Sequence, residues 1–179
     1  MASLNDRTKP NEAPGQGPSV SSSQKIIPFL WFDDKAEEAA NFYTSVFKNS
    51  KVSNVSRYGE AGPGPKGSAM SATFSLNGVE FIALNGGPLY SFTPAVSFFV
   101  RCKTQQEVDE LWDKLLEGGK PNRCGWLTDK FGLSWQIIPD KLGELLSAAD
   151  RKKAAGVMQA IMKMIKIDIQ GLEDAYNND

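Results

Sequence analysis

In the stretch KIIPFLWFDDKAEEAANFYTSVFKNS, residues 25–50, a short apolar run is followed directly by an amphipathic segment. Residues 25–32 fit a buried strand, since the run is short and rich in bulky apolar side chains. Asp34 and Glu37 have the spacing of a capping box at the start of a helix. The apolar face of that helix is formed by Ala39, Phe42, Tyr43, Val46 and Phe47. The stretch therefore predicts a strand followed by a helix.

Three strands are expected to follow this helix. Residues 51–58 alternate between polar and apolar side chains, as a half-buried strand does. A loop rich in Gly and Pro, residues 59–67, separates them from two further apolar segments. Asn77-Gly78 joins these segments, and both residues tolerate the positive φ angles of a two-residue hairpin turn. The order is therefore β-α-β-β-β.

The same order then begins again. Thr104 and Glu107 form a second capping box, and the pair Gly118-Gly119 ends the helix that they begin. The strand, the helix and the three strands of this second unit are expected over residues 95–102, 104–119, 120–122, 124–128 and 129–139. We therefore predict an α+β fold of two paired βαβββ modules, and such pairs commonly hold a pocket between the copies.

Two flanking segments differ from the modules. Residues 1–24 are rich in Pro, Gly, Ser and Asn and lack apolar periodicity, which predicts a disordered tail. Residues 140–179 are predicted to be a helical extension. Its apolar stripe is formed by Val157, Ile161 and Ile165, with Met158 and Met162 beside it. This stripe packs either on the protein's own sheets or on a second subunit, and the acidic residues around it disfavour a membrane surface.

The composition limits the classes of partner and the cellular compartment that we expect. A net charge of −1 over 179 residues gives no electrostatic reason to expect nucleic acid or an anionic membrane. The sequence has no apolar run long enough to span a bilayer, and its start does not resemble a signal peptide, so we expect a cytoplasmic protein. Cys102 and Cys124 are too few for a disulfide framework, which fits a reducing compartment.

The chain contains no histidine. This absence excludes Ser-His-Asp and Cys-His nucleophile systems, histidine general bases and nearly every imidazole-based metal site. Any chemistry has to use other groups.

Four segments together resemble the PhnB-like branch of the vicinal oxygen chelate superfamily, which includes glyoxalases, bleomycin-resistance proteins and extradiol dioxygenases. They are PFLWFDDKAEEAANFYTSVF, SRYGEAGPGPKG, LNGVEFIALNGGP and CGWLTDKFGLSWQIIP, within residues 25–139. The resemblance implies modules at residues 25–94 and 95–139 whose strands curl into an incomplete barrel around a small-molecule cavity, often in a homodimer. It also implies the family's label as a ubiquinone-pathway methyltransferase, although no glycine-rich cofactor loop opens a helix here.

Enzymes of the superfamily hold a divalent metal with side chains from the first and last strands of each module. In this sequence the first-strand positions fall on Pro28 and Ser97, and the last-strand positions on Ile82 and Gln136, with Ala83 one residue away. A catalytic metal needs about three protein ligands, so the resemblance carries over no metal site and we expect no cofactor. A site of another kind would need Asp33, Glu80 or Glu60 to turn inward.

Several residues are candidates for binding a ligand. Gln136 is expected to line the cavity, because an amide can both donate and accept hydrogen bonds. An arginine can hold an acidic ligand, and aromatic side chains suit a flat one. Cys124 is either a nucleophile or a small buried residue, and Asn85 either closes a turn or faces the ligand. The candidates are Trp31, Arg57, Asn85, Ser97, Cys124, Trp126, Trp135 and Gln136.

Two functions remain open from the sequence. The first is a metal-independent protein that binds a small aromatic or oxygen-rich molecule. The second is an enzyme resembling lyases, isomerases or dioxygenases, with an atypical metal site or with Asp33 or Glu80 as a carboxylate base. The motif GPGPKG at residues 62–67 matches a dinucleotide fingerprint in its letters, but a strand and not a helix is expected after it, so nucleotide binding is not predicted.

Overall fold

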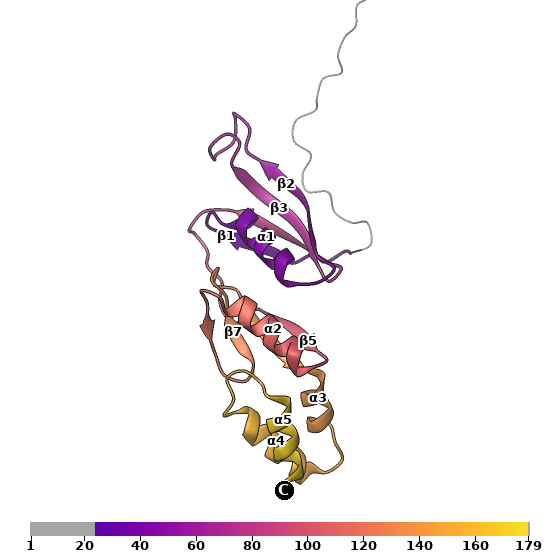
Figure 1. The fold of residues 1–179 in the computed structure, drawn as a ribbon. Coiled ribbons are helices and arrows are strands. Elements are labelled where there is room, and N and C mark those ends of the chain that lie inside the picture. Colours follow the sequence, from indigo (N-terminus) through magenta and orange to yellow (C-terminus); the bar gives the residue numbers. More distant parts are fainter. Residues whose placement is uncertain (1–23, 179) are drawn as a thin grey trace, which may run out of the picture.

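The computed structural model describes residues 24–178, which form two βαβββ units followed by three helices (Figure 1). The first unit consists of β1 (Phe29–Phe32), α1 (Ala36–Val46), β2 (Lys51–Arg57), β3 (Ala69–Leu76) and β4 (Val79–Asn85). The second consists of β5 (Ser97–Cys102), α2 (Gln105–Leu116), β6 (Lys120–Pro121), β7 (Trp126–Thr128) and β8 (Ser134–Pro139). The C-terminal helices are α3 (Asp140–Leu146), α4 (Arg151–Ile161) and α5 (Ile169–Asn177).

Each unit builds one four-stranded sheet. The strand orders are β1-β4-β3-β2 and β5-β8-β7-β6, so the two sheets have the same topology. In each sheet the first strand pairs in parallel with the last, and the other pairs are antiparallel. The predicted α+β fold with a repeated βαβββ order is confirmed, and the strands of residues 24–178 form two separate sheets and no closed barrel.

The hairpin between β3 and β4 forms where the sequence predicts it. Asn77 and Gly78 have φ angles of 47° and 83°, which lie in the region that a two-residue turn requires. Leu76 therefore pairs with Val79, and this register places Thr73 opposite Ile82.

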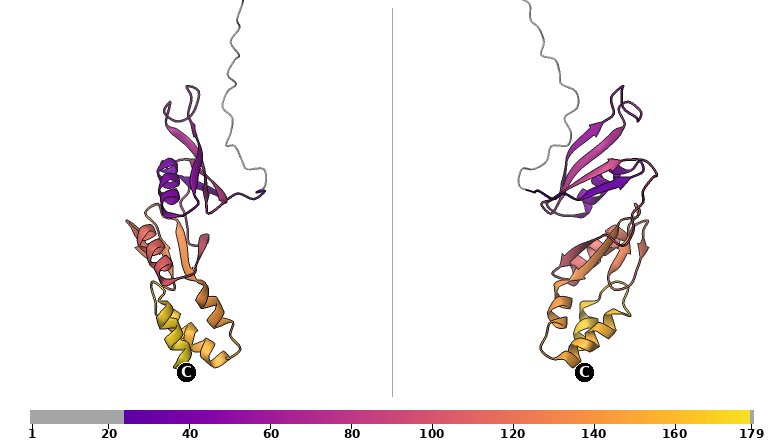
Figure 2. Two further views of the ribbon diagram at one scale, coloured as in Figure 1. Left: turned by 45° about the vertical axis from the view of Figure 1, so that its right-hand side comes forward. Right: turned by 180° about the vertical axis from the view of Figure 1, so that it is seen from behind.

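The helices α1 and α2 lie on the same side of the two sheets, and the opposite faces of the sheets are open to view from behind (Figure 2). One apolar core joins both units on the helical side. Across the junction, the ring of Phe81 is 5.1 Å from that of Phe98, and the ring of Tyr43 is 5.4 Å from that of Trp135. The two units therefore share a core and not only a linker.

A buried carboxylate crosses the same junction. Asp129 is 3% exposed and accepts four hydrogen bonds. The Tyr43 hydroxyl of α1 and the Trp135 indole N–H of β8 donate to Oδ2, each at 2.8 Å. The backbone N–H groups of Phe131 and Leu133 donate to Oδ1 at 2.8 and 3.0 Å. The side chain thus ties the helix of the first unit to the turn and last strand of the second.

The two helix starts differ. At α2 the predicted cap by Thr104 is confirmed, because Thr104 Oγ1 accepts from the Glu107 N–H at 3.2 Å, whereas the Glu107 carboxylate accepts from the N–H of Lys103, one residue before the cap, at 2.8 Å. At α1 the predicted box of Asp34 and Glu37 is wrong, since the helix begins at Ala36 without a side-chain cap from its own segment.

The start of α1 is capped from another strand. Asn85 at the end of β4 accepts a hydrogen bond from the Ala36 N–H at 2.7 Å, and its amide donates to the Ala69 carbonyl at 3.0 Å. Glu37 is instead held by an ion pair with Arg57. Local spacing could not reveal a cap that comes from 49 residues away.

The C-terminal helices pack on the second unit, with the packing centred on Ile138 of β8. The predicted stripe is wrong in its last part. Val157 and Ile161 are buried as expected, but α4 ends at Ile161 and Ile165 is 52% exposed. The chain turns there because the carbonyls of Met164 and Ile165 accept hydrogen bonds from the N–H groups of residues 124 and 125, each at 2.8 Å.

The ends of the chain are only partly described. The predicted disordered tail lies outside the described residues except for Gln24, whose side chain exchanges hydrogen bonds with the backbone of Glu80 at 2.8 and 3.2 Å. No helix within residues 24–178 combines the length and the apolar character needed to cross a membrane.

Candidate functional site

Three of the eight candidate residues meet in one pocket, which we call the Gln136 pocket. It has a volume of about 330 Å³ and lies between the second sheet and the C-terminal helices. The sheet side and its loop contribute Phe99, Arg101, Cys124, Trp126, Gln136, Ile138 and Pro139. The helical side contributes Asp140, Leu142, Gly143, Leu146 and Ile161.

Strand alternation explains why Gln136 reaches this pocket. Trp135 and Ile137 are buried in the core that faces α2, so Gln136 between them lies on the opposite face of the sheet. Its register partner is Phe99 of β5. The amide Nε2 donates to the Ser97 hydroxyl at 2.9 Å, which brings a fourth candidate next to the pocket. The pocket therefore has a neutral hydrogen-bonding group among mainly apolar walls.

Cys124 stands in a turn and not in a strand. Its φ angle is 59°, and its thiol lies 3.8 Å from the Met162 sulfur. Cys102 is fully buried, and burial raises the pKa of its thiol to about 12. Both thiols are free. Since the thiolate is the reactive form, only Cys124 is placed to react.

We expect a thiol reagent such as dithionitrobenzoate to label one thiol per native chain and two after denaturation in guanidinium. Cys124→Ser should abolish the native reaction, because Cys102 is buried and its pKa is high. The measurement is the absorbance of the released thiolate over time. Rapid labelling of two thiols in the native protein would contradict this placement of Cys102.

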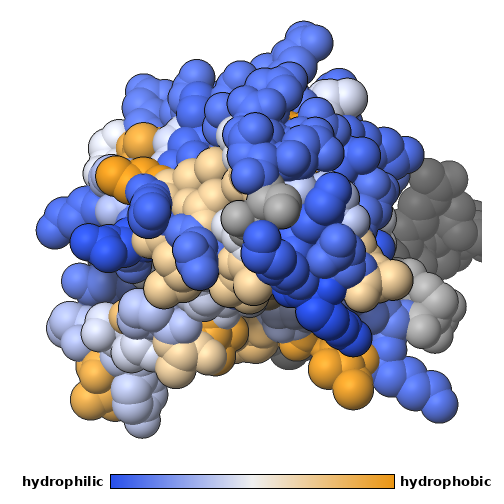
Figure 3. All heavy atoms as spheres, turned by 90° about the horizontal axis from the view of Figure 1, so that it is seen from below, coloured by the Kyte–Doolittle hydropathy of each residue, from blue (hydrophilic) through white to orange (hydrophobic). Residues whose placement is uncertain are grey.

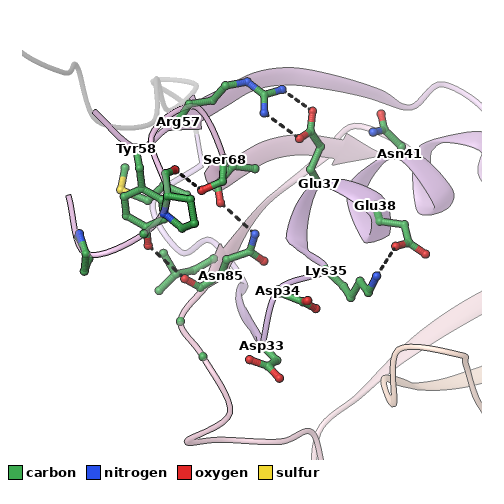
Figure 4. Close-up of a pocket in the computed structure, with 18 residues that line it drawn as sticks. Asp33, Asp34, Lys35, Glu37, Glu38, Asn41, Arg57, Tyr58, Ser68 and Asn85 are labelled. Carbon is green, nitrogen blue, oxygen red and sulfur yellow. Dashed lines mark hydrogen bonds and ion pairs between the residues drawn. The ribbon is translucent and has the colours of Figure 1, made fainter. Parts of the chain in front are cut away.

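Two other candidates line a larger pocket in the first unit, with a volume of about 1090 Å³ (Figure 4). Arg57 is held in two hydrogen bonds by the Glu37 carboxylate, at 2.7 and 3.1 Å. The Asn85 side chain forms the helix cap described above, and the backbone carbonyl of Asn85 accepts from the Tyr58 hydroxyl at 3.4 Å. Both side chains are thus already engaged in contacts that stabilise the fold.

The remaining candidates lie elsewhere. The Trp31 indole donates to the Gly87 carbonyl at 2.8 Å and lines a third pocket of about 290 Å³, near the linker between the units. Trp135 is 2% exposed and belongs to the core. The two candidate bases are also separate from Gln136, since Asp33 lines the first-unit and linker pockets and Glu80 lines a polar pocket at the β3–β4 hairpin.

The residues at the superfamily's metal positions do not fit a divalent metal. Those positions are Pro28 and Ile82 in the first unit and Ser97 and Gln136 in the second, where the Gln136 amide donates to the Ser97 hydroxyl at 2.9 Å. Together their side chains offer one amide oxygen and one neutral hydroxyl, whereas such ions are held by several carboxylate, imidazole or thiolate groups. Within residues 24–178, moreover, no three His, Cys, Asp or Glu side chains form a group able to hold a metal ion.

Sequence reasoning missed the helical wall of the Gln136 pocket. Leu142, Leu146 and Ile161 read as ordinary apolar helix positions, and Gly143 carries no side chain that could mark a site. The missing signal was spatial, because Ile161 of α4 packs in one apolar cluster with Ile138 of β8 only in the folded chain. The alternation in β8 is the one local signal, since it separates Gln136 from the core positions.

Comparison with known proteins places this fold. The 3-demethylubiquinone-9 3-methyltransferase family matches residues 24–138. A putative 3-demethylubiquinone-9 3-methyltransferase, a PhnB protein from Bacillus cereus, is 44% identical, with 65% of this chain covering 99% of that one and a TM-score of 0.61.

A protein from Pseudomonas aeruginosa, PA1353, is 22% identical, with coverages of 63% and 95% and a TM-score of 0.53, and this second likeness shows the fold alone. No curated protein matches. The family match spans more than half of the chain and agrees with the repeated βαβββ topology. The chain therefore belongs to the PhnB-like 3-demethylubiquinone-9 3-methyltransferase family, within the vicinal oxygen chelate fold.

Proposed function

We propose that this protein binds a small molecule without a metal, on the sheet face that carries Gln136. The observation that carries the proposal is the neutral amide of Gln136 in the pocket, at one of the last-strand positions from which enzymes of the superfamily hold a divalent metal. An amide donates and accepts hydrogen bonds, whereas one amide oxygen is a poor site for a divalent cation. The surrounding walls are mainly apolar, as in most ligand pockets.

A methyltransferase activity finds little support in this chain. The glycine-rich residues 62–67 lead into β3, so no helix N-terminus follows them to hold a charged cofactor. Gly62 and Gly64 instead pack against the Tyr58 ring, where an added Cβ would come within 2.7 and 2.4 Å of it. These glycines have a packing reason for their presence.

We also propose a cytoplasmic homodimer. Phe29 and Phe99 are each 56% exposed, and Leu89, Tyr90 and Val96 near the linker are more than 60% exposed. Such exposed apolar surface favours a second copy. Seen from below, apolar residues lie mainly along the lower side, and hydrophilic ones cover most of the upper side (Figure 3). Two free thiols fit a reducing compartment.

The test combines metal analysis with native mass spectrometry of the full-length protein. After dialysis we expect less than 0.1 equivalent of Zn, Mn, Ni or Fe, together with an organic molecule that is released on denaturation. Gln136→Leu should lower the bound fraction at least tenfold, since the ligand loses its hydrogen-bonding partner. Gln106→Leu on the exposed face of α2 is the matched control and should retain the ligand.

Metal retained in stoichiometric amount through dialysis, and lost in Gln136→Ala, would overturn the metal-independent proposal. A protein that releases no organic molecule and shows no thermal shift with extracted cell metabolites would overturn small-molecule binding itself, because a bound ligand stabilises the native state.

A further inference from the structure

The three C-terminal helices lie outside the fold that this chain shares with its relatives. The family match ends at residue 138, directly before α3 begins at Asp140. The Bacillus cereus protein is matched over 99% of its length by 65% of this chain, so almost none of that protein remains to supply equivalent helices. The extension is therefore a feature of this chain beyond the shared fold.

This extension supplies one wall of the Gln136 pocket. Leu142, Gly143 and Leu146 of α3 and Ile161 of α4 face the sheet residues across the pocket. Without them, the sheet face around Gln136 would lack a cover on that side. The wall is apolar, apart from Asp140 at the start of α3.

Contacts far from the pocket fix this wall in place. The Gln105 side chain accepts from the Ile169 N–H at 2.8 Å and donates to the Ile167 carbonyl at 3.1 Å. Lys166 forms an ion pair with Asp109 of α2 at 2.8 Å. Val157, Ile167 and Leu172 are fully buried between the helices. A wall held in this way is preorganised, so a ligand does not have to order it.

The charges at the rim favour an uncharged ligand. Arg101 and Asp140 are the two charged residues of the pocket, and their side chains lie 3.7 Å apart. Their charges cancel, so the rim carries no net charge that would attract a ligand of one sign. The uncharged polar groups are the Gln136 amide, the Trp126 indole N–H and the Cys124 thiol. At 330 Å³, the pocket is at the lower end of the roughly 300–1,000 Å³ that ligand pockets occupy.

We propose that the C-terminal helices make the Gln136 pocket selective for a small, uncharged and mainly apolar molecule with one hydrogen-bonding group, of the size of an indole or a phenol. This inference rests on the proposed function and adds to it the class of ligand and the element that selects it. Gln136 pairs with the polar group of the ligand, and the walls of the sheet and of α3 and α4 enclose its apolar body.

Gly143→Leu tests the wall directly. A Cβ added at Gly143 meets no heavy atom within 4 Å, so a leucine there extends into open space and leaves the helix intact. Gly59→Leu is the matched control, because its added Cβ also meets nothing and it lies in the first unit. The probe is indole, and the two readouts are its affinity by calorimetry and the rate of Cys124 labelling.

We expect indole to slow the labelling of Cys124 in the wild type and in Gly59→Leu, with affinities within twofold of each other. Gly143→Leu should weaken indole at least tenfold. Benzofuran, which has the same shape without the N–H donor, should bind several-fold more weakly, and indole-3-carboxylate and tryptamine at least tenfold more weakly.

Three results would overturn the inference while leaving the proposed function intact. They are equal indole affinity in Gly143→Leu and wild type, tighter binding of either charged analogue, and full retention of the co-purified molecule by Gly143→Leu. Loss of that molecule in Gln136→Leu but not in Gly143→Leu would assign the ligand to the sheet without the extension. If the proposed function itself fails, neither Gln136→Leu nor Gly143→Leu changes the binding of any small molecule.

Discussion

Asp129→Asn should lower the free energy of unfolding by about 3 kcal/mol, because a buried acceptor of four hydrogen bonds becomes partly a donor. If the new amide N–H₂ replaces Oδ2, the Tyr43 hydroxyl can rotate to accept from it. The Trp135 indole N–H cannot, so it is left buried without a partner. For a chain of this length the loss corresponds to a fall in Tm of about 6–12 °C, measured by thermal and urea unfolding.

Two further variants serve as comparisons for this loss of stability. Asp113→Asn changes an exposed carboxylate, 74% of whose side chain is accessible, and should alter stability by less than about 0.5 kcal/mol. Tyr43→Phe removes one donor and should cost about 1 kcal/mol. Asp129→Asn with wild-type stability would show that the carboxylate does not hold the junction together.

The pKa of Asp129 predicts how the difference in stability between the wild type and Asp129→Asn changes with pH. Burial raises this pKa above its ordinary value of 3.8, although the hydrogen bonds from Trp135, Tyr43 and the backbone oppose the change. A carboxyl whose pKa is higher in the folded state binds more protons there, so acidification favours folding through this group. The stability of wild type relative to Asp129→Asn should therefore not fall between pH 7 and about pH 4.5. A fall in that window would mean a lowered pKa.

Gly125→Ala should lower the free energy of unfolding by about 3 kcal/mol and loosen the C-terminal helices. Gly125 has a φ angle of +80°, where a residue with a Cβ costs about 1–2 kcal/mol. An added Cβ would also lie 2.9 Å from the Ile137 carbonyl oxygen and 2.8 Å from the side chain of Ile167. The Gly125 N–H donates to the Ile165 carbonyl at 2.8 Å. A shift of Gly125 would therefore strain a hydrogen bond that anchors the C-terminal helices. Denaturant unfolding measures the loss.

Gly67→Ala separates the cost of the positive φ angle from the cost of the steric clash. Gly67 has a similar φ angle of +82°, but an added Cβ there meets no heavy atom within 4 Å. We expect it to cost about 1–2 kcal/mol, so the difference between the variants reports the close approach at Gly125. Equal losses in both would mean that the second sheet and the extension can move apart without cost. Hydrogen exchange in α4 and α5 should rise in Gly125→Ala alone.

Most of the fold could be predicted from local patterns. The hairpin at Asn77-Gly78 and the cap at Thr104 depend on residues at most four positions apart, and both form as expected. The predicted cap at Asp34 was wrong although its spacing fits, because Asn85 at the end of β4 caps the helix instead. Local sequence shows which hydrogen bonds a segment can form, but a residue from a distant part of the chain can form them instead.

The candidate site was predictable only in part. Alternation in β8 places Gln136 opposite the core-facing Trp135 and Ile137, which a strand period of two dictates. Arg57 and Asn85 are polar residues near strand ends, as expected for a ligand site, yet both serve the fold through Glu37 and the start of α1. Whether a polar side chain is free for a ligand depends on partners that the sequence does not place.

The twice-repeated β-α-β-β-β order and the neutral amide at position 136 could be read from the sequence alone, because periodicity, turn residues and residue identity are local properties. Only the packing of distant elements shows that Asp129 joins the two units and that α3 and α4 line the pocket around Gln136. Tyr43 and Asp129 are 86 residues apart, and Met164 meets Cys124 only after the chain has passed through two helices. Contacts of this kind follow from the packing of whole elements, which no single stretch of sequence encodes.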